Sequence, residues 1–220
     1  MFAWSKILGL ASVVVATGLL GMVAFDVPYF KSVYFLRIDL GNGTATTASA
    51  NQTSPFVDLG ALGFCTDLKD SNGLQCSPPH IGYSLSEASQ FLNGTLPPAL
   101  AAAVVTVSSA LTKVLVLHIV AFGIALVSLA FALLAFIGIP IVDRCSSCFC
   151  GFAGAAAFAV FVFDIAFFEI IKLRVNQEGH PGTAIMGNAV YLTLLAWLFL
   201  FVTPIMFLIG RCCACCMLRK

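Results

Sequence analysis

Charged side chains are scarce in this sequence of 220 residues: they make up 10% of it, against about 25% in a typical globular chain. Hydrophobic residues make up 60%, which is more apolar surface than a soluble domain of this size could hide. The sequence also has no glycine-rich phosphate loop and no nucleophile elbow, and His80 and His180 are isolated histidines in polar segments. These shortages argue against a hydrolase, a kinase or a nucleotide-binding protein. They predict an integral membrane protein that is not an enzyme and holds no metal or other cofactor.

Long apolar runs predict four membrane-spanning helices. The first run, Ile7–Phe25, covers about 28 Å at about 1.5 Å of rise per residue, the thickness of one hydrocarbon core. We interpret it as an uncleaved signal anchor rather than a cleaved signal peptide, because it is long and no convincing cleavage site follows. Helices are expected rather than barrel strands, since each spanning helix satisfies its own backbone hydrogen bonds.

The expected fold is therefore an all-α membrane protein, a left-handed four-helix transmembrane bundle with a small antiparallel β-sheet on the outside. Pro140 and the polar stretch Asp143–Ser147 are expected to end the second helix, and the third follows after a very short link. Small residues at Gly151–Ala157 would allow close helix contact. The expected spans are residues 7–25, 111–142, 149–171 and 189–209, the connections are 26–110, 143–148 and 172–188, and the terminal segments are 1–6 and 210–220.

The polar connection of residues 26–110 has the marks of an extracellular domain. It holds three Asn-x-Thr sequons, at Asn42, Asn51 and Asn93, and the cysteines Cys65 and Cys76. Glycosylation requires the secretory lumen and a disulfide persists in an oxidising compartment, so their coincidence predicts N-glycans and a Cys65–Cys76 disulfide.

Within this connection we expect three to five strands from residues 29–80. Lys31–Leu40 and Pro55–Cys65 are the expected strands, and Asp70–Gly73 is an expected turn. Gly60 and Gly63 predict a close backbone approach or a bulge. A short helix is expected at Ser84–Leu92, and proline near residue 97 is expected to begin the next one.

Basic residues orient the chain. The positive-inside count is close to a tie, but long loops cross the membrane largely regardless of charge, which leaves the basic tail to decide. Both termini are therefore expected in the cytoplasm. The basic residues counted inside are Lys6, Arg144, Arg211, Arg219 and Lys220, and those outside are Lys31, Arg37, Lys69, Lys113, Lys172 and Arg174.

Several short motifs resemble a known family. A large first outer loop with Gly-x-x-Gly-aromatic-Cys…Cys resembles claudin-type four-span proteins, although Phe64 stands where claudins carry Trp. The fungal Sur-seven/PalI family is a closer likeness, through Val27-Pro…Lys31-Ser-Val-Tyr-Phe-Leu36, Leu62-Gly-Phe-Cys65, Cys76-Ser…Ile81-Gly-Tyr83 and Leu111-Thr-Lys113…Leu117-His-Ile-Val-Ala121. The resemblance implies a plasma-membrane protein of fungal cells tied to ambient-pH signalling, cortical membrane domains, or wall and cell-fusion events.

The other cysteines lie at the expected cytoplasmic ends of the helices. S-palmitoylation is the leading interpretation, because juxtamembrane cysteines beside basic residues are common acylation sites. A zinc site, a Cys145-x-x-Cys148 redox pair and plain thiols are the alternatives. The cysteines concerned are Cys145, Cys148, Cys150, Cys212, Cys213, Cys215 and Cys216.

Ionisable residues inside the spans are Lys113, His118, Asp164 and Glu169. In antiparallel helices Lys113 should lie at the depth of Glu169 and His118 nearer Asp164. Because such groups are costly in a bilayer, they are usually paired or functional. Interhelical pairing is the leading interpretation, and an ion or proton path is the alternative.

Two functions remain open at this stage. The leading hypothesis is a non-catalytic accessory or scaffold protein whose outer domain binds another plasma-membrane protein or a wall component, with membrane lipids and possible copies of itself as neighbours and no nucleic-acid partner. The alternative is an auxiliary subunit of a channel or transporter that uses Asp164, Glu169 and His118.

Overall fold

The structure is a computed structural model, and it describes residues 2–27, 29–39, 56–67, 74–79, 98–137, 140–177 and 183–217. The chain divides into two compact units. The helix-bundle unit comprises Met1–Met22, His118–Val162 and Tyr191–Lys220, and the sheet unit comprises Val23–Leu117 and Phe163–Val190. We describe each by itself. The expected turn at 70–73 and the expected helix at 84–92 lie outside the described residues.

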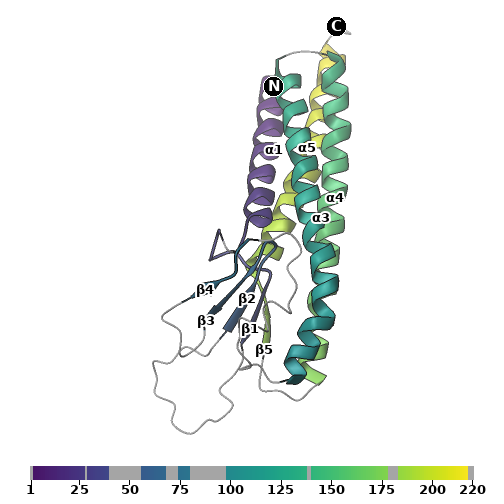
Figure 1. Cartoon of the computed structure of the whole chain (residues 1–220). Coiled ribbons are helices and arrows are strands. Elements are labelled where there is room, and N and C mark those ends of the chain that lie inside the picture. Colours follow the sequence, from purple (N-terminus) through teal and green to yellow (C-terminus); the bar gives the residue numbers. More distant parts are fainter. Residues whose placement is uncertain are drawn as a thin grey trace, which may run out of the picture. The chain divides into compact units, whose positions relative to one another are not determined.

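Four long helices carry the apolar runs (Figure 1): α1 (Phe2–Ala24), α3 (Pro98–Phe136), α4 (Pro140–Gln177) and α5 (Asn188–Met217). Each contains a stretch long and apolar enough to cross a membrane, namely Lys6–Ala24, Val116–Phe136, Cys145–Ile170 and Asn188–Phe207. The expected class of a mostly helical, four-span membrane protein with a small antiparallel sheet is confirmed.

Small side chains fill the centre of the helix-bundle unit. One buried cluster joins Leu20 and Leu200 to a set of alanines, Ala16, Ala125, Ala153, Ala157 and Ala196. In a membrane, where lipid is as apolar as leucine, small residues promote helix association because they let backbones approach. Gly154 illustrates this, since a Cβ there would lie 3.6 Å from the backbone of Leu200, whereas Gly151 has open space around it.

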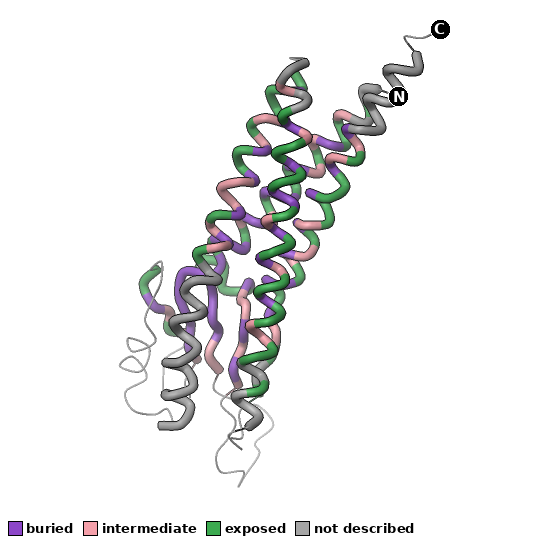
Figure 2. Tube along the Cα trace, turned by 90° about the vertical axis from the view of Figure 1, so that its right-hand side faces the viewer, coloured by how far each residue is buried: buried purple, intermediate pink, exposed green. Residues whose placement is uncertain are grey.

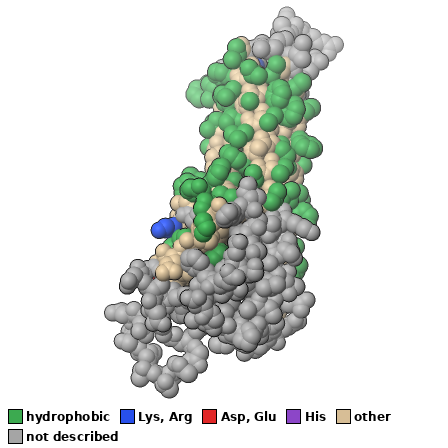
Figure 3. Space-filling model, in the orientation of Figure 1, with side chains coloured by type: hydrophobic (Ala, Val, Ile, Leu, Met, Phe, Trp, Pro, Cys, Tyr) green, Lys and Arg blue, Asp and Glu red, His purple; other side chains and the backbone are tan. Residues whose placement is uncertain are grey.

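The outside of the same helices is apolar as well. Buried positions recur along one side of each helix and exposed positions along the other (Figure 2). Hydrophobic side chains cover much of the described helix surface on the face that Figure 3 shows. Val15, Leu134, Phe163 and Phe201 are between 43% and 55% exposed. A helix that is hydrophobic all round is typical of a membrane span.

The connection between the second and third helices lies earlier than expected. The α3 helix ends at Phe136, and Pro140 begins α4 instead of ending α3. Residues 143–148, expected as a cytoplasmic loop, are helical. Proline is favoured in a first helical turn because it has no N–H to leave unpaired, so the same residue that ends one helix can start the next. The expected bounds of 142 and 149 for these two helices are wrong.

The sheet unit contains a five-stranded antiparallel sheet in the order β4-β3-β2-β1-β5. Its strands are β1 (Leu36–Asp39), β2 (Phe56–Leu59), β3 (Phe64–Asp67), β4 (Gln75–Cys76) and β5 (Thr183–Met186).

Two expectations about the sheet need correction. The single strand expected at Pro55–Cys65 is two strands, because the chain turns back at Gly60–Gly63, where the amide of Gly60 donates to the carbonyl of Gly63 at 2.8 Å. The sheet also takes one strand from outside residues 29–80: β5, from the connection between α4 and α5, pairs with β1. The third helix is longer than expected and ends at Gln177 instead of 171.

Candidate functional site: the disulfide-linked sheet and its anchor

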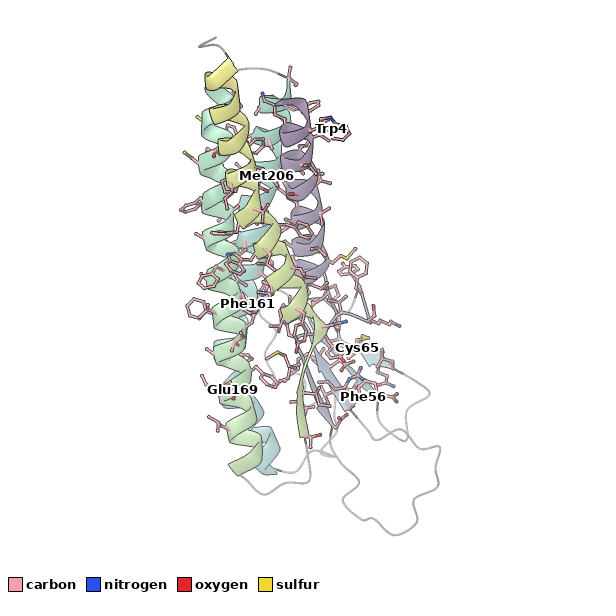
Figure 4. The ribbon with its side chains drawn as sticks, turned by 180° about the vertical axis from the view of Figure 1, so that it is seen from behind. Trp4, Phe56, Cys65, Phe161, Glu169 and Met206 are labelled. Carbon is pink, nitrogen blue, oxygen red and sulfur yellow. A yellow bond between two sulfur atoms is a disulfide. The ribbon has the colours of Figure 1, made fainter. Side chains whose placement is uncertain are left out.

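The expected disulfide joins the last two strands of the sheet. Cys65 in β3 lies directly opposite Cys76 in β4, with their Cα atoms 4.0 Å apart and their sulfurs bonded (Figure 4). Ser77 extends this pairing, since its amide donates to the carbonyl of Phe64 at 2.9 Å and its hydroxyl accepts from the Phe64 amide at 3.1 Å. The two-residue strand β4 is thus held by its pairing with β3, by the disulfide, and by the hydrogen bonds of the next residue, Ser77.

Asp26, two residues beyond α1, anchors the β2–β3 turn. Its side chain is fully buried, and Oδ1 accepts a hydrogen bond from the amide of Ala61 at 2.7 Å. A Cβ on Gly60 would lie 2.6 Å from Cβ of Val27 and 2.9 Å from Oδ1 of Asp26, so no larger residue fits there without a shift. A close approach is therefore present at Gly60, and the groups that approach it are the side chains of Val27 and Asp26.

Burial raises the pKa of the Asp26 carboxyl well above its ordinary value, and the hydrogen bonds from Ala61 and Leu62 offset only part of this. Among the described residues, Oδ2 of Asp26 has no hydrogen-bond partner. A neutral carboxylic acid is therefore the form that the folded site favours.

This pKa shift predicts that the stability of the folded protein depends on pH. Since the folded pKa exceeds the unfolded one, the folded state binds the proton more tightly, and stability falls as pH rises from about 4 through the folded pKa. Asp26→Asn keeps an oxygen acceptor without a charge and is expected to remove this slope. Denaturant unfolding of both proteins at a series of pH values measures the slope. Equal slopes in the wild-type and Asp26→Asn proteins would contradict the assignment to Asp26.

Asn188 fastens the start of α5 to the chain before β1. Its Oδ1 accepts from the amide of Tyr34 at 3.1 Å, and its Nδ2 donates to the carbonyl of Ser32 at 2.7 Å. The neighbouring backbone adds two bonds, from Gly187 N to Phe35 O at 2.8 Å and from Ala189 N to Tyr34 O at 3.2 Å. The sheet is therefore tied to the end of α1 through Asp26 and to the start of α5 through Asn188.

Arg37 is held by an ion pair and by two aromatic rings. Its guanidinium donates to both carboxylate oxygens of Asp58, its cross-strand neighbour, at 2.7 and 2.8 Å. It also lies over the rings of Tyr34 and Phe56, 4.5 and 4.3 Å from their centroids. The hydrogen bond to Asp58 raises the pKa of Arg37 further. A bidentate pair stacked on aromatic rings has a fixed geometry.

The remaining predicted site residues differ in how far they are buried. His118 is 1% and Asp164 5% exposed, whereas Glu169 on α4 is exposed (Figure 4). His118 belongs to the helix-bundle unit and Asp164 to the sheet unit, and their expected proximity stays a prediction. The side chain of Lys113 and the sequons Asn42, Asn51 and Asn93 lie outside what the structure describes. No set of three metal-binding side chains occurs among the described residues.

The cysteines of α4 differ in exposure. Cys145 and Cys148 are exposed, whereas Cys150 is buried with Val13 and Ala132. The side chains of Cys212, Cys213, Cys215 and Cys216, near the end of α5, are not described.

We therefore predict that acyl groups attach to Cys145 and Cys148 and not to Cys150, because a transferase must reach the thiol. The test uses a background protein in which Cys212, Cys213, Cys215 and Cys216 are replaced by Ser. In hydroxylamine-dependent acyl exchange, this protein should be labelled, and the further double substitution Cys145→Ser/Cys148→Ser should abolish the label. Cys150→Ser is the matched control and should keep it. Label that follows Cys150 instead, or no label in any protein, would refute this assignment.

Sequence reasoning did not identify Asp26, Arg37 or Asn188 as sheet anchors. A carboxylate directly after an apolar run, and a Gly-Asn pair directly before one, were the available signals. Neither reveals which backbone amides it will meet.

The fold and these contacts define a four-span membrane protein whose small disulfide-linked sheet is fastened to its helix ends. The model of the SUR7/PalI family matches residues 3–217, and the chain belongs to this family. A search of curated proteins found no match.

Proposed function

We propose that this protein is a non-catalytic accessory or scaffold protein of the plasma membrane, with both termini in the cytoplasm and the sheet outside. Its role would lie in ambient-pH signalling, cortical membrane-domain organisation or cell-wall and cell-fusion processes, the settings that the family suggests. The sheet would bind another membrane protein or a wall component. Family membership and the four apolar helices support the membrane setting, and the sheet supports the binding role.

The observation that carries the binding role is the exposed part of one face of the sheet, where Ile185 lies beside Arg37; Asp58 and Cys65 on the same face are buried, at 2% and 1% exposed. One face holds Leu36, Ile38, Leu59 and Phe64, which are 2% to 6% exposed and form its core. The strand register places Ile185, Arg37, Asp58 and Cys65 in one row of the other face, and Asp39, Phe56 and Asp67 in the next.

This second face has the composition of a binding surface. Ile185 is 47% exposed beside the stacked Arg37 and Phe56. Arginine and aromatic side chains held in fixed positions carry much of the energy of protein interfaces. Because the backbone beneath is tied by the disulfide, Asp26 and Asn188, little ordering would be needed on binding.

The test compares two exposed positions on opposite faces. Ile185→Lys puts a charge on the proposed surface, whereas Gln75→Lys puts one on the opposite face, since Gln75 alternates with Cys76. In crosslinked pull-downs of the full chain from native membranes, quantified by mass spectrometry, Ile185→Lys is expected to reduce recovery of the specific partner about tenfold, the effect of losing about 1.4 kcal/mol. Gln75→Lys should leave recovery unchanged. Equal recovery with both variants would contradict the proposed surface.

One observation keeps the second candidate, a channel or transporter subunit, in view. His118 and Asp164 are buried within the candidate spans, and both have interaction partners in the protein. Asp164→Asn separates the two functions. Lost flux with normal surface expression favours transport, while lost assembly favours a structural role.

A further inference from the structure

Exposed aromatic side chains gather directly after α1. Phe25, Tyr29 and Phe30 are 48%, 64% and 45% exposed, and the neighbouring Lys31 is also exposed. We call these four residues the aromatic turn. Aromatic rings gain more from burial than most side chains, so a group of them held on the surface indicates a binding surface.

The backbone of the aromatic turn is fixed. The amides of Tyr29 and Phe30 both donate to the carbonyl of Asp26, at 2.8 and 3.0 Å, and the amide of Val33 donates to the carbonyl of Phe30 at 2.9 Å. Asp26 and Val27 are fully buried beneath it. The exposed rings are therefore carried by a hydrogen-bonded turn in which the side chains of Asp26 and Val27 are buried.

The aromatic turn lies beside the membrane because it continues a spanning helix. Phe25 is the next residue after the span Lys6–Ala24. Even a fully extended chain would carry Tyr29 only about 18 Å from Ala24, and the hydrogen bonds back to Asp26 shorten this. The headgroup layer is about 6 Å deep on each side of the hydrocarbon core.

We propose that the aromatic turn is a lipid-binding surface that lies in the headgroup layer of the leaflet next to the sheet. Aromatic rings favour this layer because one part of it is apolar and the other wet. The ammonium of Lys31 binds the phosphate of a phospholipid, with its alkyl stem along the rings. Lipid, and not a second protein, is the proposed occupant because the turn directly follows a candidate span in the chain.

This contact would fix the sheet relative to the bilayer. The carboxyl of Asp26 holds the β2–β3 turn at Ala61, and its carbonyl holds the aromatic turn. The same residue therefore links the lipid-binding surface to the sheet. Lipid contact at Tyr29 and Phe30 would limit tilting of the sheet. The face of the sheet that carries Arg37 would then stay at a constant distance from the bilayer.

The experiment places one tryptophan at a time in the full chain, reconstituted in phosphatidylcholine vesicles. Trp4 and Trp197 are replaced by Phe, and Tyr29→Trp is compared with Phe56→Trp. Phe56 lies at the far end of β2 from the turn that Asp26 binds, about 13 Å along the strand. Lipid carrying a nitroxide on its headgroup should remove most of the emission of the Tyr29→Trp protein and little from the Phe56→Trp protein.

Two additions complete the test. Lys31→Glu should reduce the lipid quenching of the Tyr29→Trp protein, and Lys31→Arg should retain it. Each variant is first checked for an intact Cys65–Cys76 disulfide, so that misfolding is recognised. Quenching by aqueous iodide instead of lipid nitroxide would overturn the proposal in favour of a water-facing turn. Quenching by neither would overturn it in favour of a protein-covered one.

Discussion

Gly187→Ala is expected to separate β5 from the sheet and to lower the free energy of unfolding by about 3 kcal/mol, at the upper end of overpacking effects. A Cβ at Gly187 would overlap the carbonyl oxygen of Tyr34 and lie 2.6 Å from its carbonyl carbon and 2.8 Å from that of Phe35. These are backbone atoms, so no rotamer change can relieve the overlap. The Gly187–Phe35 and Asn188–Tyr34 hydrogen bonds would be lost with it.

Denaturant unfolding of the detergent-solubilised protein measures this loss, and protease sensitivity near residue 183 reports on β5. Gly123→Ala is the matched control, since a Cβ there meets nothing within 4 Å. Alanine is favoured over glycine in a helix, so this variant should be unchanged or about 0.5–1 kcal/mol more stable. Equal stability of Gly187→Ala and wild type would show that β5 does not pack on β1 as described.

Removing the disulfide is the other change with a large expected effect. Cys76→Ser opens a loop closed across a sequence separation of 11 residues, which in the chain-entropy model lowers stability by about 3 kcal/mol. Since β4 pairs over only two residues, its register with β3 depends on this bond. We expect retention of Cys76→Ser and Cys65→Ala in the secretory pathway.

Surface biotinylation and non-reducing mass mapping measure this outcome. Cys148→Ser, which removes an exposed thiol outside the disulfide, is the control and should reach the surface normally. Detection of Cys65 and Cys76 as unpaired thiols in the mature wild-type protein would contradict the expected dependence.

The signature Gly60-Ala-Leu-Gly63 acquires a physical meaning from the structure. Gly60 and Gly63 close the β2–β3 turn through a hydrogen bond, and Gly60 leaves the space that Asp26 and Val27 occupy. The motif thus forms one side of a contact, and the carboxyl of Asp26, just beyond α1, forms the other side. We expect the proposed binding surface on the sheet to depend on this contact.

The features that could be predicted from the sequence are those that depend on residues close together in the chain. Long apolar runs indicate spans wherever they lie, and the strand at β1 falls inside the expected Lys31–Leu40. The connection between α3 and α4 was predicted too late in the chain because Ile137–Val142 is apolar. The first polar residues, from Asp143, therefore suggested the end of the second helix. Pro140 permitted either reading, since proline both ends and begins helices.

The features that were missed depend on contacts between distant residues. The strand β5 is short and lies more than a hundred residues from β1, its partner, so no local pattern reveals the pairing. Asn188 and Asp26 are likewise ordinary polar residues at helix ends until the chain brings Tyr34 and Ala61 to them. The sites of β-pairing and anchoring therefore required the structure.

The account rests on the claim that the sheet and its connecting segments lie on the extracellular side of the membrane. The most direct measurement inserts an epitope tag at residue 51 and tests antibody access in intact and permeabilised cells, with endoglycosidase treatment in parallel. The account predicts access in intact cells and a mobility shift from glycan on at least one of Asn42, Asn51 and Asn93, with Asn93 the least used. Access only after permeabilisation, with no mobility shift, would contradict it.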